Sequence, residues 1–280
     1  MVTKISQLLI LSSKNDLSAT RLIKEGQKLT KVSHYLYNDL TRKSLPLPKI
    51  PSGKNVALLA RQPYVANAIE HSADALLHMI LSEFSFASVF DDKLYQQSFM
   101  RYEDKLYQSY VLQKLELPFA QLWNTTKPKA IVFPIIAKKR ISSRHNANYV
   151  LHDRSELQTF MKDFDTAQYI FQTYFPLKAD YRILICKGKL LGTVARDAWL
   201  EEGNKTIVKV AGATEVPSKI AQQAIKLSDY IGCDLCGIDV GETETGDFFF
   251  IEYNPSPQFL GFERETGRNI AEAVIKSLLT

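Results

Sequence analysis

Two C-terminal segments, residues 236–241 and 248–254, constrain this chain most, because together they predict a β-hairpin with acidic side chains on one face. The second segment is aromatic and apolar, and its period-two alternation places Glu252 and Asn254 on the same face. With a four-residue loop between the strands, Asp239 lies directly opposite Glu252. Three residues are predicted on the other face: Phe249, Ile251 and Tyr253.

Two carboxylates that face each other across a hairpin repel and weaken the sheet. A divalent cation between them removes the conflict, and oxygen ligands suit Mg²⁺ that substrate phosphates complete. The alternative is an exposed face whose acids are simply solvated. Asn254, followed by a chain that Pro-Ser-Pro stops, favours a metal site. On this interpretation, removing Asp239 or Glu252 leaves the metal-free protein at least as stable as before.

The composition is typical of a soluble globular enzyme. A chain of 280 residues with 45% hydrophobic and 23% charged residues can form two or three compact units. A net charge of +5 is compatible with phosphate-bearing substrates but too small to indicate nucleic-acid binding. No segment approaches the roughly 20 apolar residues of a membrane helix, so no membrane partner is expected.

The cysteines indicate a reducing compartment. Only Cys186, Cys233 and Cys236 occur, and this odd, sparse count favours the cytoplasm over a disulfide framework. Cys233 and Cys236 have CxxC spacing, but no second pair exists to complete a zinc site. Buried core thiols are therefore favoured over redox chemistry.

The first hundred residues alternate predicted strands with predicted helices. This alternation predicts a small parallel sheet covered by helices. The strands are expected at 7–11, 32–37, 55–60 and 87–90, and the helices at 17–28 and 64–83.

The rest of the chain predicts two lobes of mixed helix and antiparallel strand. Asp153 or Ser155 is a suitable N-cap for the first helix of this part. Strands are expected at 130–137, 149–151, 169–174, 182–186 and 189–196, and helices at 155–163, 218–231 and 270–279.

Three motifs carry a family resemblance: Gly237-Ile-Asp-Val240, Ile251-Glu-Tyr-Asn-Pro-Ser-Pro257 and Gly261-Phe-Glu-Arg-Glu-Thr-Gly-Arg-Asn-Ile-Ala271. They resemble the C-terminal signature of ATP-grasp ligases, most closely the RimK-like branch, which joins amino acids to carboxylates through an acyl-phosphate. The similarity continues upstream through most of the chain. It implies an α/β fold with α+β lobes: a pre-ATP-grasp domain with a parallel sheet at 1–95, a nucleotide-clamping small lobe at 96–175 and a C-terminal lobe at 176–280.

The resemblance implies ATP and Mg²⁺ as cofactors, and Mn²⁺ suits the same ligands. In the family, the residues that match Asp239, Glu252 and Asn254 hold the magnesium ions that bridge ATP's phosphates. The motif Pro134-Ile-Ile-Ala-Lys138 is similar to one whose lysine contacts the α- and β-phosphates. Lys138 has a solvated turn as its alternative role.

A duplicated motif leaves two candidates for the second phosphate-binding lysine. Asp-Lys-Leu-Tyr-Gln occurs at 92–96 and again at 104–108, and family ligases use an Asp-Lys pair in this region. Asp104-Lys105 is the better match, which implies that Lys105 rather than Lys93 contacts ATP.

The resemblance also implies an adenine pocket at the hinge between the lobes, formed by Gln172, Tyr174 and Phe175. Asp180 is placed to accept hydrogen bonds from the ribose hydroxyls, although a cap at the start of a strand is an equal alternative. Arg196 first and Arg182 second match arginines that stabilise charge on the transferring phosphoryl group. Their alternative is an ordinary surface ion pair.

Two segments depart from the family pattern. The phosphate-covering loop, 140–148, contains no glycine, so the cations Arg140, Arg144 and His145 are candidates to replace backbone donors. Residues 204–214 keep only a weak similarity, in Ala211-Gly-Ala213, to an element that shapes the acceptor site in relatives.

These motifs favour an ATP-dependent carboxylate–amine ligase that adds an amino acid to a small-molecule or peptide carboxylate. The alternatives are a nucleotide-binding protein that has lost turnover and a phosphotransferase on the same fold. The expected partners are the carboxylate and the amine, with neither nucleic acid nor membrane, and a homo-oligomer is compatible with the sequence.

Overall fold

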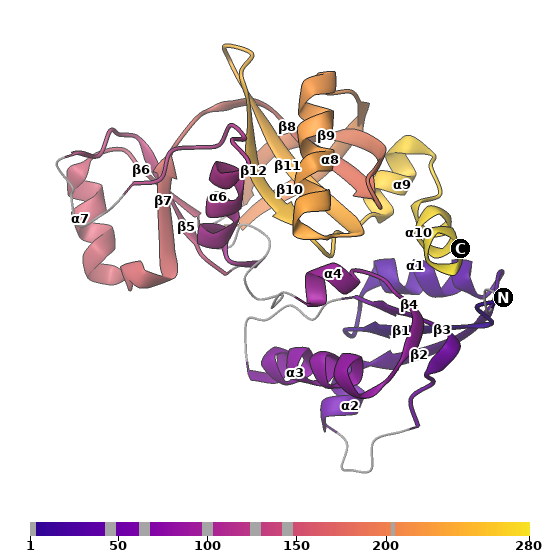
Figure 1. Ribbon diagram of the computed structural model, residues 1–280. Helices are drawn as coiled ribbons and strands as arrows, with labels where there is room; N and C mark the ends of the chain where they lie inside the picture. The colour runs from indigo at the N-terminus through magenta and orange to yellow at the C-terminus, as the bar shows by residue number, and fades with distance from the viewer. Residues whose placement is uncertain are drawn as a thin grey trace.

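The structure, a computed structural model, describes residues 4–42, 49–61, 68–96, 103–123, 130–141, 148–202 and 205–280. These residues form three sheets, which Figure 1 shows as three separate parts of the molecule. The strand orders are β2-β1-β3-β4, β6-β5-β7 and β10-β9-β8-β11-β12.

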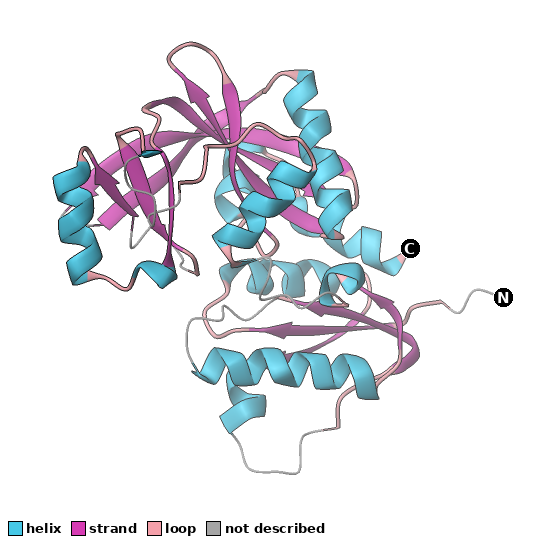
Figure 2. Cartoon of the chain, turned by 60° about the vertical axis from the view of Figure 1, so that its left-hand side comes forward, coloured by secondary structure: helices cyan, strands magenta, loops and turns pink. Residues whose placement is uncertain are grey.

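The N-terminal sheet is parallel, as the sequence predicts, and β1 lies between β2 and β3. Helix α1 covers one face, and α2 and α3 cover the other (Figure 2). A short helix, α4 (Asp92–Tyr95), follows the last strand. The strands are β1 (Gln7–Ser12), β2 (Lys31–Leu36), β3 (Gly53–Ala60) and β4 (Phe86–Val89), and the helices are α1 (Leu17–Gly26), α2 (Tyr37–Arg42) and α3 (Ala68–Glu83).

Strand β1 is apolar throughout because both of its faces are buried. Leu8 and Ile10 pack toward α1, whereas Leu9 and Leu11 pack toward α2 and α3. An uninterrupted apolar run of this length is what a central parallel strand requires, and it explains why the first strand was predictable.

The three-stranded antiparallel sheet and helix α7 form a small lobe. Its core contains Ile135, Leu157, Phe160 and Phe171. Asp153 is the N-cap of α7, because its Oδ1 accepts hydrogen bonds from the main-chain N–H groups of Ser155 and Glu156. The elements are β5 (Ile135–Lys139), β6 (Asn148–Leu151), α7 (Arg154–Asp163) and β7 (Tyr169–Thr173).

The five-stranded antiparallel sheet has a different cover on each face. Helices α6 and α8 pack on one face, and α9 and α10 pack on part of the other. The elements are α6 (Lys105–Lys114), β8 (Leu177–Cys186), β9 (Lys189–Glu202), β10 (Lys205–Thr214), α8 (Ser218–Ile231), β11 (Leu235–Thr243), β12 (Phe248–Asn254), α9 (Leu260–Thr266) and α10 (Ile270–Leu279).

The C-terminal helices connect this sheet to the N-terminal domain. Ile270 and Val274 of α10 share one buried cluster with Leu22 of α1 and Leu184 of β8 (Figure 1). Helix α6 lies within the predicted small lobe but packs on the five-stranded sheet. The domain boundaries at 95 and 175 therefore remain a prediction.

Several elements differ from the sequence prediction. Helix α1 ends at Gly26 rather than Lys28, and β5 begins at Ile135, five residues later than expected. The predicted start of α3 at Tyr64 lies outside the described residues. The elements that were not predicted include α2, β10 and α9.

All three cysteines are free thiols and buried, as expected for core residues. Within the described ranges, no helix is both long and apolar enough to cross a bilayer.

Candidate active site

The predicted hairpin is present. Strands β11 and β12 are joined by residues 244–247, and Asp239 pairs directly with Glu252, as the sequence predicts. Gly237 pairs with Asn254. On β11, Gly237 and Asp239 share one face because they are two residues apart.

The predicted alternation along β12 is only partly right. The register shifts between Asp239 and Val240, so Ile251 is an extra residue in β12 and forms a β-bulge. Because of this bulge, Phe250 and Tyr253 both enter the core beneath α6 and α8. Phe249 instead contacts Phe175, with ring centroids 5.3 Å apart.

The Asp239 carboxylate is bound by two arginines rather than left facing Glu252 alone. Arg182 donates from Nε to Oδ1 at 2.7 Å and from Nη2 to Oδ2 at 2.8 Å, and Arg196 donates from Nη1 to Oδ2 at 2.9 Å. Burial opposes ionisation of Asp239, but the two guanidinium groups outweigh it and lower its pKa. The repulsion inferred from sequence is therefore compensated within the sheet.

Arg196 extends this arrangement to Asp180. Its Nη2 donates to Asp180 Oδ1 at 2.5 Å, and both side chains are buried. Burial and the nearby Asp239 charge raise the pKa of Asp180, against the attraction of Arg196. Neither proposed alternative holds, since Arg196 is not a surface residue and Asp180 lies within β8 rather than at its start.

Strand register produces this ion-pair chain. Asp239 on β11 is directly opposite Arg182 on β8, and Asp180 on β8 is directly opposite Arg196 on β9. Opposite charges at paired positions attract across neighbouring strands. We call Asp180, Arg196, Asp239 and Arg182 the charged tetrad.

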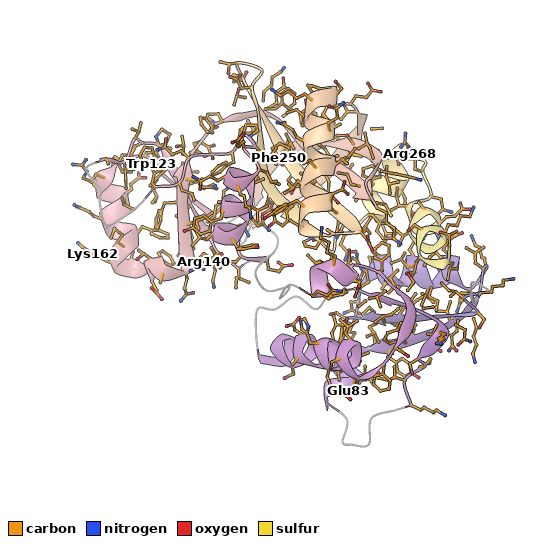
Figure 3. The ribbon with its side chains drawn as sticks, viewed as in Figure 1. Glu83, Trp123, Arg140, Lys162, Phe250 and Arg268 are labelled. Carbon is orange, nitrogen blue, oxygen red and sulfur yellow. The ribbon has the colours of Figure 1, made fainter. Side chains whose placement is uncertain are left out.

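Lys105 is the first residue of α6 and lies beside the hairpin. Its Nζ is 3.7 Å from Glu252 Oε2. The preceding residue, Asp104, caps α6 by accepting from Leu106 N at 2.9 Å, and its carboxylate also pairs with Arg140. Figure 3 shows Arg140 where the small lobe meets α6.

The two copies of the duplicated motif have different surroundings. Lys93 of the first copy donates to the Asp229 carbonyl at 3.0 Å, near the end of α8, whereas Lys105 lies beside Glu252. The structure thus brings the predicted lysine, Lys105, to the hairpin.

Gln108, the last residue of the second copy, was missed by the sequence analysis. Its side-chain amide donates to the Tyr253 carbonyl at 2.9 Å and accepts from the Tyr253 N–H at 3.2 Å. Because β12 is an edge strand, this side chain replaces a neighbouring strand between Glu252 and Asn254. No local signal distinguishes Gln108 from Gln96 in the first copy.

Lys138 of β5 is a cation of the small lobe that lies near the hairpin acid Glu252. Burial lowers the pKa of its ammonium to about 8; the charges of Glu252 and Asp180 oppose this change, and Lys105 adds to it. A second acid that sequence did not single out, Glu103, lies in the same region. Burial raises the pKa of Glu103 to about 7, with Lys105 opposing and Glu252 adding to the increase.

The hinge between the lobes is internally hydrogen-bonded. The Thr173 N–H donates to the Gln121 carbonyl at 2.9 Å, and the Tyr174 N–H donates to the Pro134 carbonyl at 3.1 Å. Gln172 is buried and Phe175 is 40% exposed. The predicted adenine pocket therefore has two backbone amides already engaged and an accessible aromatic ring at Phe175.

Arg140, the first of the three cations predicted for the phosphate loop, directly follows β5 and pairs with Asp104 at the start of α6. Its role in phosphate binding stays a prediction. Arg144 and His145, the other two candidates, lie outside the described residues.

The hairpin oxygens fit a hard cation. In the described part of the chain, Asp239 Oδ1 accepts one hydrogen bond, from Arg182, and Asn254 Oδ1 accepts one, from Ser256 N–H. Each of these oxygens has a second lone pair, and Glu252 is directly opposite Asp239. No cluster of three His, Cys, Asp or Glu side chains suited to a metal occurs in the described ranges, so Asn254 and phosphate oxygens would complete the coordination.

Four basic and four acidic side chains meet here from the small lobe, α6 and the large sheet: Lys105, Lys138, Arg182, Arg196, Glu103, Asp180, Asp239 and Glu252. Such a site can hold a polyanion together with cations without a large net charge.

Known proteins are similar to this chain in sequence and in fold. Residues 113–278, more than half of the chain, match the RimK-like ATP-grasp domain. The Mus musculus β-citrylglutamate synthase B is 26% identical over 149 residues, which are 51% of this chain and 38% of that protein. This chain thus covers well under two thirds of that relative's length.

Solved structures share the fold over nearly the whole chain. The ATP-grasp ligase PsnB, complexed with a minimal precursor, has a TM-score of 0.77 at 15% identity and covers 98% of this chain and 99% of its own. The macrocyclase MdnC from Microcystis aeruginosa, bound with precursor peptide MdnA, has a TM-score of 0.71 at 17% identity with coverage of 98% and 99%. At these identities, the likeness establishes the ATP-grasp fold.

Proposed function

Because this chain belongs to the RimK-like ATP-grasp family, we propose that it is an ATP-dependent carboxylate–amine ligase. The observation that carries the proposal is the meeting of Lys138 from the small lobe, Lys105 from α6 and the charged tetrad of the large sheet around the hairpin acids. Cations from opposite sides of one site are suited to the phosphates of a nucleotide held between two lobes.

The first step is transfer of the γ-phosphoryl group. A substrate carboxylate oxygen attacks the γ-phosphorus, the bond between that phosphorus and the bridging oxygen breaks, and ADP leaves with the bonding electrons. Arg182 and Arg196 stabilise the charge that spreads over the transferred group. Asp239 and Asp180 hold both guanidinium groups in place before substrate arrives.

The second step forms the amide. The amine nitrogen attacks the carbonyl carbon of the acyl-phosphate, the bond from carbon to the phosphate oxygen breaks, and inorganic phosphate leaves while the nitrogen loses a proton. The protein contributes positioning and charge compensation, so no Ser, Cys or His nucleophile is needed.

Asp239, Glu252 and Asn254 are the residues that would hold Mg²⁺, and Mn²⁺ would meet the same oxygen ligands. When bound, the ion neutralises charge on the β- and γ-phosphates. Structures of PsnB have been solved with Mg and ADP, which supports this cofactor pair for the present chain.

At the other end of the nucleotide, the adenine and the ribose also have proposed contacts. Gln172, Tyr174 and Phe175 line the adenine site, with the exposed Phe175 ring available for stacking. Asp180 accepts from the ribose hydroxyls through the carboxylate capacity that Arg196 leaves free. The enzyme adds an amino acid to a small-molecule or peptide carboxylate, and the buried free thiols agree with a cytoplasmic location.

The absence of glycine from 140–148 favours a second candidate, a nucleotide-binding protein without turnover. A phosphotransferase is the third. Incubation with Mg²⁺-ATP, candidate carboxylates and amino acids separates them by mass spectrometry. A ligase yields ADP, phosphate and an amide, a binding protein yields no ADP, and a phosphotransferase yields ADP and a stable phosphorylated acceptor. A full substrate panel that gives no amide would contradict the ligase proposal.

A further inference from the structure

The segment that follows the hairpin is held by the N-terminal domain. Arg61, immediately after β3, is 4% exposed, and its Nη2 donates to the carbonyls of Ser256 at 3.2 Å and Pro257 at 3.0 Å. These are residues two and three after Asn254. The contacts join two parts of the chain separated by nearly 200 residues.

Arg61 is itself fixed at both ends. Its main-chain N–H donates to the Leu11 carbonyl at 2.8 Å, and its Nε donates to Asp16 Oδ2 at 3.0 Å. Asp16 is the N-cap of α1, where its Oδ1 accepts from Ala19 N at 3.0 Å. The guanidinium group therefore has one orientation set by the sheet and helix of the N-terminal domain.

A second contact secures the same segment. Gln258 donates from Nε2 to Asp16 Oδ1 at 3.2 Å and accepts from Ser18 Oγ at 2.7 Å. The Phe259 N–H also donates to Ser18 Oγ, at 3.2 Å. Residues 256–259 are thus bonded to Arg61, which follows β3, and to the start of α1.

The contacts of Arg61 extend to the candidate metal ligand. Ser256 donates its main-chain N–H to Asn254 Oδ1 at 2.8 Å, which fixes the orientation of the Asn254 amide. Pro255 and Pro257 have restricted φ angles and no N–H, so this segment has few main-chain donors of its own that could fix its conformation. Because Ser256 precedes Pro257, its φ and ψ angles are restricted. Holding the Ser256 carbonyl through Arg61 therefore also limits the directions in which the Ser256 N–H can point.

We propose that Arg61 is a positioning residue through which the N-terminal domain orients Asn254 for the metal–nucleotide site. The inference rests on the proposed function, because it assigns Asn254 to that site. It adds that the pre-ATP-grasp domain contributes to metal binding through hydrogen bonds to the chain after the hairpin. Arg61 itself touches neither the phosphates nor the ion.

The chain offers a matched control in Arg21. This arginine of α1 also joins the N-terminal domain to the C-terminal part, through Glu263 Oε2 at 3.0 Å and Asn269 Oδ1 at 2.8 Å. Its partners lie on α9 and at the N-cap of α10 rather than between Asn254 and Gln258. Arg21→Ala therefore weakens the docking of the two parts without releasing the Ser256 carbonyl.

The experiment is calorimetric titration of ADP into the whole 280-residue chain over a series of Mg²⁺ concentrations. Loss of an outer contact to a metal ligand lowers metal affinity by about 10–100-fold. Arg61→Ala loosens such a contact, from the Ser256 N–H to Asn254, so it should raise the Mg²⁺ concentration for half-maximal ADP binding by about 10-fold, the low end of that range. Arg21→Ala should change it less than about 2-fold, within the error range expected of a distant site. Equal shifts in both variants would overturn the inference.

A double-mutant cycle tests whether Arg61 acts through Asn254. In an Asn254→Ala background, Arg61→Ala should produce no further shift, whereas additive shifts would show that the two act independently. If Arg61→Ala does not fold, Arg61→Lys keeps a cation beside Asp16 but loses the guanidinium fork, and an unchanged Mg²⁺ dependence in that variant overturns the inference. Failure of the wild-type protein to bind ADP with Mg²⁺ would instead refute the proposed function.

Discussion

The two lobes that face each other at the site hold their charges differently. On the large sheet, each member of the charged tetrad is bonded to a partner of opposite sign on a neighbouring strand. On the small lobe, burial lowers the pKa of Lys138 to about 8 although Glu252 opposes the change, and no ion pair in the described part of the chain is shown for this lysine. The large sheet is therefore complete before nucleotide binds, whereas the small lobe carries a cation whose charge a bound phosphate would stabilise.

The largest expected effect tests whether the charged tetrad of the large sheet is fully ion-paired before nucleotide binds. Asp239→Ala removes the buried carboxylate that binds both Arg182 and Arg196, and it leaves Arg196 paired with Asp180 alone. Breaking a buried ion pair in this way costs about 3–5 kcal/mol of unfolding free energy. Chemical denaturation in the absence of metal measures this loss. The result reverses the expectation drawn from sequence, in which removal of a repelling acid was harmless.

Glu252→Ala is the matched control for that experiment. Glu252 is more exposed than Asp239, and its salt bridge to Lys105 is 3.7 Å long. The loss without metal should therefore be clearly smaller than the loss in Asp239→Ala, because Glu252 is partly solvated and its ion pair is long. Equal losses for Asp239→Ala and Glu252→Ala would contradict the contrast between the pre-bonded tetrad and the hairpin's second acid.

The next effect concerns Lys138 and pH. A lysine whose pKa is lowered in the folded state binds fewer protons there than in the unfolded state, so its contribution to stability rises with pH between about 8 and about 10.4. Phosphate binding favours the charged ammonium, so ATP affinity should fall as pH increases above about 8. Calorimetry in buffers of different ionisation enthalpy would detect proton uptake on binding.

Lys138→Met supplies the control for this pH dependence. The variant should lose about 1.5–3 kcal/mol of ATP-binding free energy near pH 7 and show a flatter affinity profile above pH 8. A full pH dependence retained in the variant would assign the titration to another group.

A smaller effect separates the duplicated lysines. Lys105 is already paired with Glu252, so Lys105→Ala should cost about 1.5 kcal/mol of ATP-binding free energy, at the low end for a charge-assisted contact. Lys93→Ala should leave ATP binding unchanged, because Lys93 contacts the end of α8. Greater sensitivity at Lys93, measured by the same calorimetry, would place the nucleotide elsewhere.

Sequence predicted best those elements whose own periodicity is strong. The bounds of β12, α8 and α10 were predicted without error, because an alternating or amphipathic pattern runs through each. The four-residue loop and the pairing of Asp239 with Glu252 were also correct. These features depend on residues close together in the chain.

The features that sequence missed depend on distant partners. The bulge at Ile251 changes which side chains face the core, yet the local pattern shows unbroken alternation. Strand β10 exists because β9 continues to Glu202 and pairs with it. Gln108 and Arg61 likewise bond to main-chain groups more than 140 residues away. Such partners are defined only by the folded chain.

The most direct test of the proposed site is a thermal melt with and without Mg²⁺-ATP for the wild-type protein and Glu252→Ala. A ligand that binds only the folded state raises the melting temperature, and at about 100 times its dissociation constant it contributes about 2.7 kcal/mol. The wild-type protein should show this stabilisation and Glu252→Ala should show little or none. An undiminished Mg²⁺-ATP shift in Glu252→Ala would contradict a metal–nucleotide site at the hairpin.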